Sequence, residues 1–370
     1  MLGFADIVHD VTTINDLIAP DLLHDALDQG LVATRDSRDG FTILNYTERA
    51  VYTPGAWSNP ATRICRGLIA DTTTGVVIAR PWEKFFNHNQ AEAGGFDLDA
   101  PVEVTDKMDG SLGIIHHDRA GRPRVATRGS FESEQAIHAT TVLHDRYNHI
   151  AWPPDLTVLV EIVYPQNRIV VSYGDLDDLI LLGAVRTSTG SYIGPVEAQQ
   201  LTGWDGPVTT VFTYPTMRDA LAAVPRPGAE GLCVRFLNQD RIVKIKQDDY
   251  IRLHRIVSGL SERTVWEHAL TGQPVESLLD GLPDELHQWV RDVRGRLDSE
   301  VARVVAAAAV VFDAICSAPS RKDFAVAAAQ HPEFRAMLFV MLDGGDPAGV
   351  VLKGLKPQAG VRAVPAAEVD

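Results

Sequence analysis

Cysteine, signal-like segments and long apolar runs are scarce in this chain of 370 residues. The three cysteines, at 65, 233 and 316, have no C-x-x-C spacing, which argues against a disulfide framework or a zinc site and is typical of a reducing compartment. The longest apolar run, 304–312, is too short to span a bilayer and predicts a buried helix. Residues 1–10 lack a basic start and an apolar core, so no secretory signal is expected. These absences favour a cytoplasmic protein with no membrane partner.

Positive charge is also in deficit, because the formal net charge is −15. Nonspecific nucleic-acid binders usually present basic surfaces, so any contact with nucleic acid must be local and sensitive to salt. The twelve histidines include no H-E-x-x-H metal-binding pattern. His116 and His117 precede Asp118 and Gly121, and this predicts a solvated turn.

Lysine is rare although arginine is common: the chain has 7 lysines and 27 arginines. Only four lysines, at 84, 107, 244 and 246, precede residue 322. Arginine could form a salt bridge at these positions, but its guanidinium stays protonated, whereas a lysine amine can lose its proton and act as a nucleophile. This argues for a chemical role of Lys107, while the other three could be point-charge phosphate binders.

The pattern of the chain between 41 and 246 is mostly that of strands, because short β-branched or aromatic runs alternate with Gly, Pro and Asp. Helical periodicity interrupts it at 133–147, 195–201 and 217–223. The predicted strands are 41–45, 67–70, 76–79, 102–105, 112–116, 125–127, 157–163, 179–185, 231–236 and 241–245. An α+β domain of antiparallel sheets with peripheral helices is expected.

The pattern changes after Tyr250. Segments 262–270, 284–317 and 321–342 are rich in Ala, Leu, Val and Arg at helical spacing, which predicts a small all-helical domain. The length of the chain and its 45% apolar content suit two domains. The expected division is a first domain at 1–254, a helical domain at 255–356 and a flexible tail at 357–370.

Lys107 stands directly before an Asp109-Gly110 turn, beside a run of strand-forming residues. A covalent nucleotidyl carrier needs a neutral amine in line with a phosphorus, and the glycine allows a phosphate or sugar to approach the backbone. Alone, K-x-D-G is a weak signal, and an isolated match is more often a surface hairpin with a solvated lysine than a catalytic site.

Two glutamates lie in apolar strands further along the chain. A buried Glu161 is costly unless it meets a hydroxyl, a cation or a metal, and a ribose or Mg²⁺ would serve. Glu230 repeats the situation, and strand alternation predicts that Leu232 and Val234 share its face while Cys233 lies opposite.

Cations recur around these glutamates. Lys244 and Lys246 alternate along a strand, so their ammonium groups share one face, where a polyanion would relieve their repulsion and their field would depress the pKa of a neighbouring lysine. Arg66 and Lys84 stand beside glycine or aromatic residues and could grip phosphates, whereas Arg128 could hold a phosphate or close a hairpin. The nearby aromatic residues are expected in the core rather than as a stacking platform: Trp82, Phe85 and Phe86.

In this order, K-x-D-G, a strand glutamate, E-G and K-x-K resemble the covalent nucleotidyltransferases: DNA ligases, RNA ligases and mRNA-capping enzymes. The fuller strings resemble more narrowly the ATP-dependent RNA ligases of the T4 RNA ligase 1 type: R-P-W-E-K-F-F-N, R-G-S-F-x-S-E-Q-A, E-I-V-Y-P-Q-N-R-I-V-V and K-I-K-Q-D-D-Y-I-R-L-H. The resemblance implies an α+β nucleotidyltransferase domain with ATP-grasp-like antiparallel sheets, followed by the helical domain.

The resemblance also implies an enzyme that forms phosphodiester bonds through lysyl-AMP and RNA-adenylate intermediates, with ATP and Mg²⁺, or Mn²⁺ in its place. Glu161 is expected to bind the ribose and Glu230 to act with the metal, while Tyr250 matches an aromatic position after the K-x-K strand. The expected catalytic set is Lys107, Lys244, Lys246 and Glu230. The expected nucleotide-binding set is Arg66, Lys84, Lys107, Asp109, Gly110, Arg128, Glu161, Glu230, Cys233, Lys244 and Lys246.

The implied partner is RNA with 5′-phosphate and 3′-hydroxyl ends, for which cleaved tRNA is one hypothesis. Since the chain has no G-x-x-x-x-G-K-[ST], end healing would need a separate kinase and phosphatase. Arg128 departs from the family, which has lysine there, so proton transfer at this position is in doubt but phosphate binding is not. Two alternatives remain open: a GTP-using capping-type enzyme, and a noncatalytic RNA-binding module on the same fold.

Overall fold

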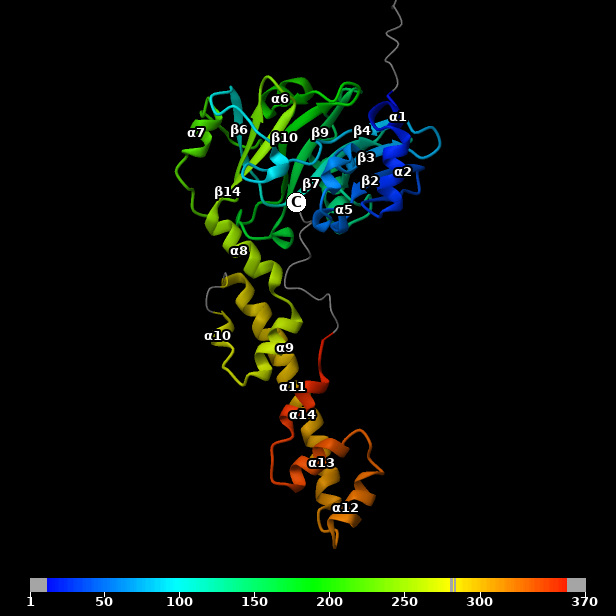
Figure 1. Ribbon diagram of the computed structural model, residues 1–370, viewed down its shortest axis with the longest axis vertical. Coiled ribbons are helices and arrows are strands. Elements are labelled where there is room, and N and C mark those ends of the chain that lie inside the picture. The colour runs from blue at the N-terminus through cyan, green and yellow to red at the C-terminus, as the bar shows by residue number, and fades with distance from the viewer. Residues whose placement is uncertain (1–11, 280–281, 283, 358–370) are drawn as a thin grey trace, which may run out of the picture. The chain divides into compact units, whose positions relative to one another are not determined.

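The computed structural model of the chain describes residues 12–279, 282 and 284–357. The start of the chain and all but Pro357 of the expected tail at 357–370 lie outside the described residues. The chain divides into two compact units, one ending at Ile251 and the other beginning at Arg252. Figure 1 shows strands in the first unit and helices throughout the second.

Three sheets form the first unit (Figure 1). One sheet has the order β1-β2-β3-β4, and all its pairs are antiparallel. Its strands are Val32–Asp36, Phe41–Tyr46, Arg66–Asp71 and Val77–Ala79. All six residues of β3 are buried, so this strand contributes to the apolar core on both faces of its sheet.

The other two sheets have five strands each. One has the order β12-β6-β13-β14-β5, with strands Val211–Phe212, Val102–Lys107, Gly231–Phe236, Arg241–Lys246 and Phe86–Asn87. The other has the order β11-β10-β9-β7-β8, with strands Tyr192–Ile193, Asp178–Arg186, Leu156–Val163, Ser111–His117 and Pro123–Thr127. The consecutive strands β6 and β7 therefore belong to different sheets, and the turn after Lys107 joins them.

Helices accompany these sheets. Helix α5 begins after Ser133, whose hydroxyl accepts a hydrogen bond from the Ala136 amide, and its buried face packs in one cluster with β7, β9 and β10. The helices of the first part of the chain are α1 Ile14–Leu17, α2 Pro20–Asp28, α3 Glu48–Tyr52, α4 Pro60–Ile64, α5 Glu134–Arg146, α6 Pro195–Thr202, α7 Met217–Leu221 and α8 Asp248–Gly259. Short 3₁₀ turns occupy Ala56–Ser58, Ala91–Ala93 and Pro165–Asn167.

The second unit is helical over its described residues. Its helices are α9 Glu262–Leu270, α10 Glu276–Leu279, α11 Asp284–Ile315, α12 Arg321–Ala328, α13 Arg335–Leu342 and α14 Ala348–Gly354. Val265 of α9 packs with Val290 and Val293 of α11, so the long α11 supplies part of the core. Within the described part of the chain, no helix combines the length and apolar character needed to cross a membrane.

The predicted α+β class, the ten strands and the three helices of the first domain are confirmed, and the ends of these elements differ from the prediction by a few residues.

The single helical segment expected at 321–342 is wrong. The helix ends before Pro332, whose ring cannot continue it, and the segment divides into α12 and α13. The turn predicted at His116 is also wrong: His116 is buried in β7, and burial lowers its pKa to about 4. The run 304–312 is only partly buried, since Val310 is exposed.

Candidate active site

Lys107 ends β6 at the passage between two sheets, and its side chain is buried. The next residues return as β7, and Gly110 approaches β9 so closely that a Cβ there would lie 2.6 Å from the Ile162 carbonyl oxygen. The Gly110 amide donates to Oε1 of Glu161 at 2.8 Å. The turn of the K-x-D-G motif thus holds the strand glutamate beside the lysine, and glycine is required sterically at this point.

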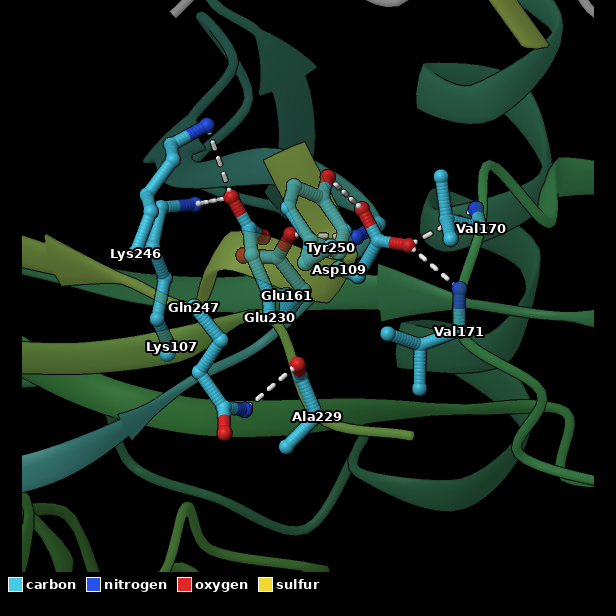
Figure 2. A network of polar contacts seen from close by, with 12 residues as sticks. Lys107, Asp109, Glu161, Val170, Val171, Ala229, Glu230, Lys246, Gln247 and Tyr250 are labelled. Carbon is cyan, nitrogen blue, oxygen red and sulfur yellow. Dashed lines mark hydrogen bonds and ion pairs between the residues drawn. The ribbon is translucent and has the colours of Figure 1, made fainter. Parts of the chain in front are cut away.

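Glu230 lies between two lysines. Its Oε1 is 2.8 Å from Nζ of Lys107 and 2.9 Å from Nζ of Lys246 (Figure 2). The strand register explains why these three side chains lie together, because Gly231, the residue after Glu230, pairs with Lys107 on one side and with Lys246 on the other. The Glu230 carboxylate is almost fully buried, so the two ammonium groups provide its charge compensation.

The face predicted for Glu230 is wrong. Leu232 and Val234 point into the apolar core, whereas Glu230 turns toward the lysines. The strand β13 begins only at Gly231, where φ is +156° and a Cβ would collide with the Ile245 carbonyl oxygen. Simple alternation fails here because the glutamate precedes the regular strand.

Lys244 and Cys233 form a directly opposed pair in the same sheet. Lys244 is buried, and its Nζ lies 5.4 Å from the centre of the Phe85 ring. Burial raises the pKa of the Cys233 thiol to about 11, so this side chain is a neutral, weakly polar wall at ordinary pH. The predicted placement of Lys244 and Lys246 on one face agrees with these contacts.

Tyr46 joins two of the predicted phosphate-binding cations. Its hydroxyl accepts from Lys84 at 3.1 Å and also bonds Nη1 of Arg128, whose guanidinium lies over the tyrosine ring. The Lys84 ammonium also lies within 6 Å of the rings of Trp57 and Phe86. Sequence reasoning missed Tyr46, because its role arises from the packing of β2 against segments far along the chain.

A cavity of about 60 Å³ opens beside Lys107. Its walls include Arg66, Trp82, Phe85, Glu161 and Cys233. The guanidinium carbon of Arg66 lies 5.0 Å from the centre of the Phe85 ring, so this wall of the cavity contains a cation packed on an aromatic face. The expectation of a core position is confirmed for Phe86, which is buried, and for Trp82, which packs against a core cluster while also lining the cavity, but it is wrong for Phe85, a half-buried residue of the cavity wall.

Gly110 also lines this cavity, whereas Asp109 and Tyr250 do not. Asp109 is buried and accepts from the Tyr250 hydroxyl at 2.7 Å and from the amides of Val170 and Val171 at 2.8 and 2.7 Å (Figure 2). Its own backbone amide donates a hydrogen bond to the Tyr173 hydroxyl at 2.8 Å. Burial and the charge of Glu230 raise the pKa of the Asp109 carboxyl. Asp109 and Tyr250 thus link the motif turn to α8 and the loop after β9.

The carboxylate oxygens of this site suit a Mg²⁺ ion that is also bound by substrate phosphates and waters. Among residues 12–279, 282 and 284–357, no group of three or more His, Cys, Asp or Glu side chains could hold a metal ion. Mg²⁺ is commonly bound by one or two carboxylates together with substrate phosphates and waters, so such a group is not required. Glu230 and Glu161 supply carboxylate oxygens near the cavity, and they fit a metal that arrives with a polyphosphate.

The first unit is an α+β fold of three sheets with a cavity at the end of β6. A model of the RNA ligase family matches residues 64–251, just over half of the chain, and the chain belongs to that family. It is similar to RNA ligase 1 of bacteriophage TS2126, with 27% identity over 202 residues that cover 50% of each protein.

A second relative is a putative bifunctional polynucleotide kinase/RNA ligase of Autographa californica nuclear polyhedrosis virus, with 26% identity over 58% of this chain and 35% of that protein. The chain therefore spans half or less of the length of these two relatives. Among solved structures, it is similar to a Naegleria gruberi RNA ligase with ATP and Mn, with 18% identity, a TM-score of 0.35 and coverage of 43% of this chain and 52% of that one.

Proposed function

We propose that this chain is an ATP-dependent RNA ligase that uses Lys107 as its nucleophile. The observation that carries the proposal is the approach of Lys107 and Lys246 to one carboxylate, Glu230, beside a cavity that Glu161 also lines. Membership of the RNA ligase family supports the same assignment.

In the first step, the Lys107 amine attacks the α-phosphorus of ATP, the P–N bond forms and pyrophosphate leaves. Lys107 pairs with Glu230 as an ammonium group, so it must release one proton to solvent before its neutral amine attacks. The buried Lys244 and its neighbour Lys246 provide positive charge for the phosphoryl oxygens as negative charge develops there. Bound Mg²⁺, held by Glu230, would add neutralising charge that side chains alone do not supply.

In the second step, a 5′-phosphate oxygen of RNA attacks the lysyl-AMP phosphorus, and the P–N bond breaks to give RNA-adenylate and free Lys107. In the third step, an RNA 3′-hydroxyl attacks the 5′-phosphorus, the phosphodiester bond forms and AMP leaves. Glu161, fixed by the Gly110 amide, is positioned to bind the ribose. Arg66, Lys84 and Arg128 supply charges for the polyphosphate, and Tyr46 holds the last two in place.

The test is incubation of the full chain with α-labelled ATP or GTP and Mg²⁺, followed by addition of 5′-phosphorylated single-stranded RNA. We expect label on the protein from ATP and joined RNA afterwards, and neither product with Lys107→Ala. Label from GTP alone would instead favour a capping-type enzyme, and no label with RNA binding retained would favour a noncatalytic module.

We extend the proposal to RNA repair in the cytoplasm, with cleaved tRNA as one substrate. The three free cysteines suit a reducing compartment, and the helical second unit is a candidate for substrate choice. Ends with a 5′-hydroxyl or a cyclic phosphate would need a separate end-healing kinase and phosphatase. Joining of cleaved tRNA and of unstructured RNA by the full chain, compared with a chain ending at Gly259, tests this. If the truncated chain preferred cleaved tRNA over unstructured RNA as strongly as the full chain does, the helical unit would not determine the choice of substrate.

A further inference from the structure

Gln247 is the residue directly after β14, and the mechanism above gives it no role. Its half-buried side chain reaches the irregular segment 226–229 that leads into Glu230. Two prolines and a glycine lie in or beside this segment, at 225, 227 and 228, so local hydrogen bonding alone does little to fix it. The segment nevertheless has to present Glu230 accurately between two lysines.

The Gln247 amide binds this segment at both of its ends. Nε2 donates to the Arg226 carbonyl oxygen at 2.9 Å and to the Ala229 carbonyl oxygen at 2.7 Å, while Oε1 accepts from the Arg226 amide. The Gln247 backbone amide also donates to the Glu230 carbonyl oxygen at 3.0 Å. Figure 2 shows the contact with Ala229 next to the lysines and Glu230. The donor and acceptor ends of this one side chain are both satisfied by the segment.

Arg226 is anchored on its other side to the strand of the proposed nucleophile. Its guanidinium lies 2.7 and 3.2 Å from the two carboxylate oxygens of Asp106, the residue before Lys107, and it donates to the Gly231 carbonyl oxygen at 2.9 Å. The segment that carries Glu230 is therefore held between β6, through Asp106, and β14, through Gln247.

We propose that Gln247 is a positioning residue, which sets the carboxylate of Glu230 between Lys107 and Lys246 by fixing the segment before it. The inference rests on the proposed function, because Glu230 matters there as the carboxylate that faces the nucleophile and the metal. A backbone segment that moves by a fraction of an ångström would move both ion pairs, and groups that orient a metal-binding carboxylate commonly affect metal affinity.

Two substitutions separate this role from simple packing. Gln247→Glu keeps the length and an acceptor for the Arg226 amide, but it turns a carboxylate toward the Arg226 and Ala229 carbonyl oxygens, which both lose the donor that Nε2 of Gln247 provides. Gln247→Met keeps the length of the side chain and removes both its hydrogen-bond donor and its hydrogen-bond acceptor. The matched control is Gln199→Glu in α6, since Gln199 also donates to a backbone carbonyl oxygen, that of Trp204, at 3.2 Å.

The experiment has two readouts on the full chain. Hydrogen–deuterium exchange of the ligand-free protein is expected to quicken at 226–231 in both Gln247 variants, with the peptides of β9 and β10 unchanged. The Mg²⁺ concentration for half-maximal protein–AMP formation is expected to rise about tenfold in both, with no change in Gln199→Glu.

An unchanged exchange rate at 226–231, or an unchanged Mg²⁺ midpoint, in both variants would overturn the assignment of Gln247. Wild type is measured alongside. If wild type forms no protein–AMP, the proposed function fails, while the exchange experiment still decides whether Gln247 fixes the segment.

Discussion

Nζ of Lys107 lies 2.8 Å from Oε1 of Glu230, so the proposed nucleophile of this chain is paired with the carboxylate of the residue directly before the neighbouring strand β13. The pair is buried, and Lys246 shares the same oxygen. Removal of the carboxylate charge would therefore leave the ammonium groups of the buried Lys107 and the half-buried Lys246 close together without their shared counter-charge.

Glu230→Gln is expected to destabilise the first unit by about 3 kcal/mol, since breaking a buried ion pair leaves uncompensated charge, and to abolish protein–AMP formation. Urea unfolding followed by a probe in the first unit measures the first effect. Asp99→Asn, which removes an exposed ion pair with Arg218, should change stability little. Equal effects of the two substitutions would contradict a buried, charge-dependent site.

Tyr46→Phe removes the hydroxyl that Lys84 and Arg128 share. Hydrogen bonds to charged groups contribute about 1.5–3 kcal/mol, so we expect the KM for ATP in protein–AMP formation to rise about tenfold. Tyr52→Phe, at an exposed tyrosine, is the control. An unchanged KM would mean that Tyr46 does not organise these cations.

Tyr250→Phe removes one of the hydrogen bonds to the buried Asp109 carboxylate. Because burial already raises the pKa of this carboxyl, loss of a donor should make its charged form less stable, with a cost of about 1–3 kcal/mol at neutral pH. The folded-state pKa is raised, so the cost should fall as the pH falls and the carboxyl becomes protonated. A cost independent of pH between 4 and 8 would argue against an ionised Asp109.

Thiol alkylation tests the chemistry of the cavity wall. Burial raises the pKa of Cys233 from 9.0 to about 11 and that of Cys65 to about 12, so at pH 8 iodoacetamide should modify the exposed Cys316 first. Since the folded-state pKa of Cys233 is raised, its neutral thiol contributes stability that is full below pH 9 and is lost as the pH passes about 11.

Peptide mass spectrometry over a series of pH values follows each cysteine. We expect Cys233 to react only at high pH, and more slowly still with ATP present, because Cys233 lines the cavity. Rapid reaction of Cys233 at pH 8 would contradict the raised pKa of its thiol.

Much of the site could be predicted from strand periodicity. The alternation of Lys244 and Lys246 on one face follows from the two-residue repeat of a regular strand, and β14 is regular over both. The same rule fails for Glu230, since Gly231 begins the strand in a conformation that lets the preceding residue turn to the other face.

Other features depended on contacts that the sequence does not display. Tyr46 and Gln247 act through partners far along the chain, at 84, 128 and 226, and nothing local distinguishes them from other tyrosines and glutamines. His116 was predicted in a turn because Asp and Gly follow it, but the hairpin turns two residues later, so the histidine lies within β7 beside Phe131.

The most direct test of the central claim is to locate the AMP after the full chain is incubated with ATP and Mg²⁺. The protein is digested, and mass spectrometry identifies the adenylylated peptide in wild type and in Lys107→Arg, which keeps the positive charge beside Glu230. The account predicts AMP on Lys107 in wild type and none on the variant. AMP on Lys244 or Lys246, or an adenylylated Lys107→Arg protein, would contradict it.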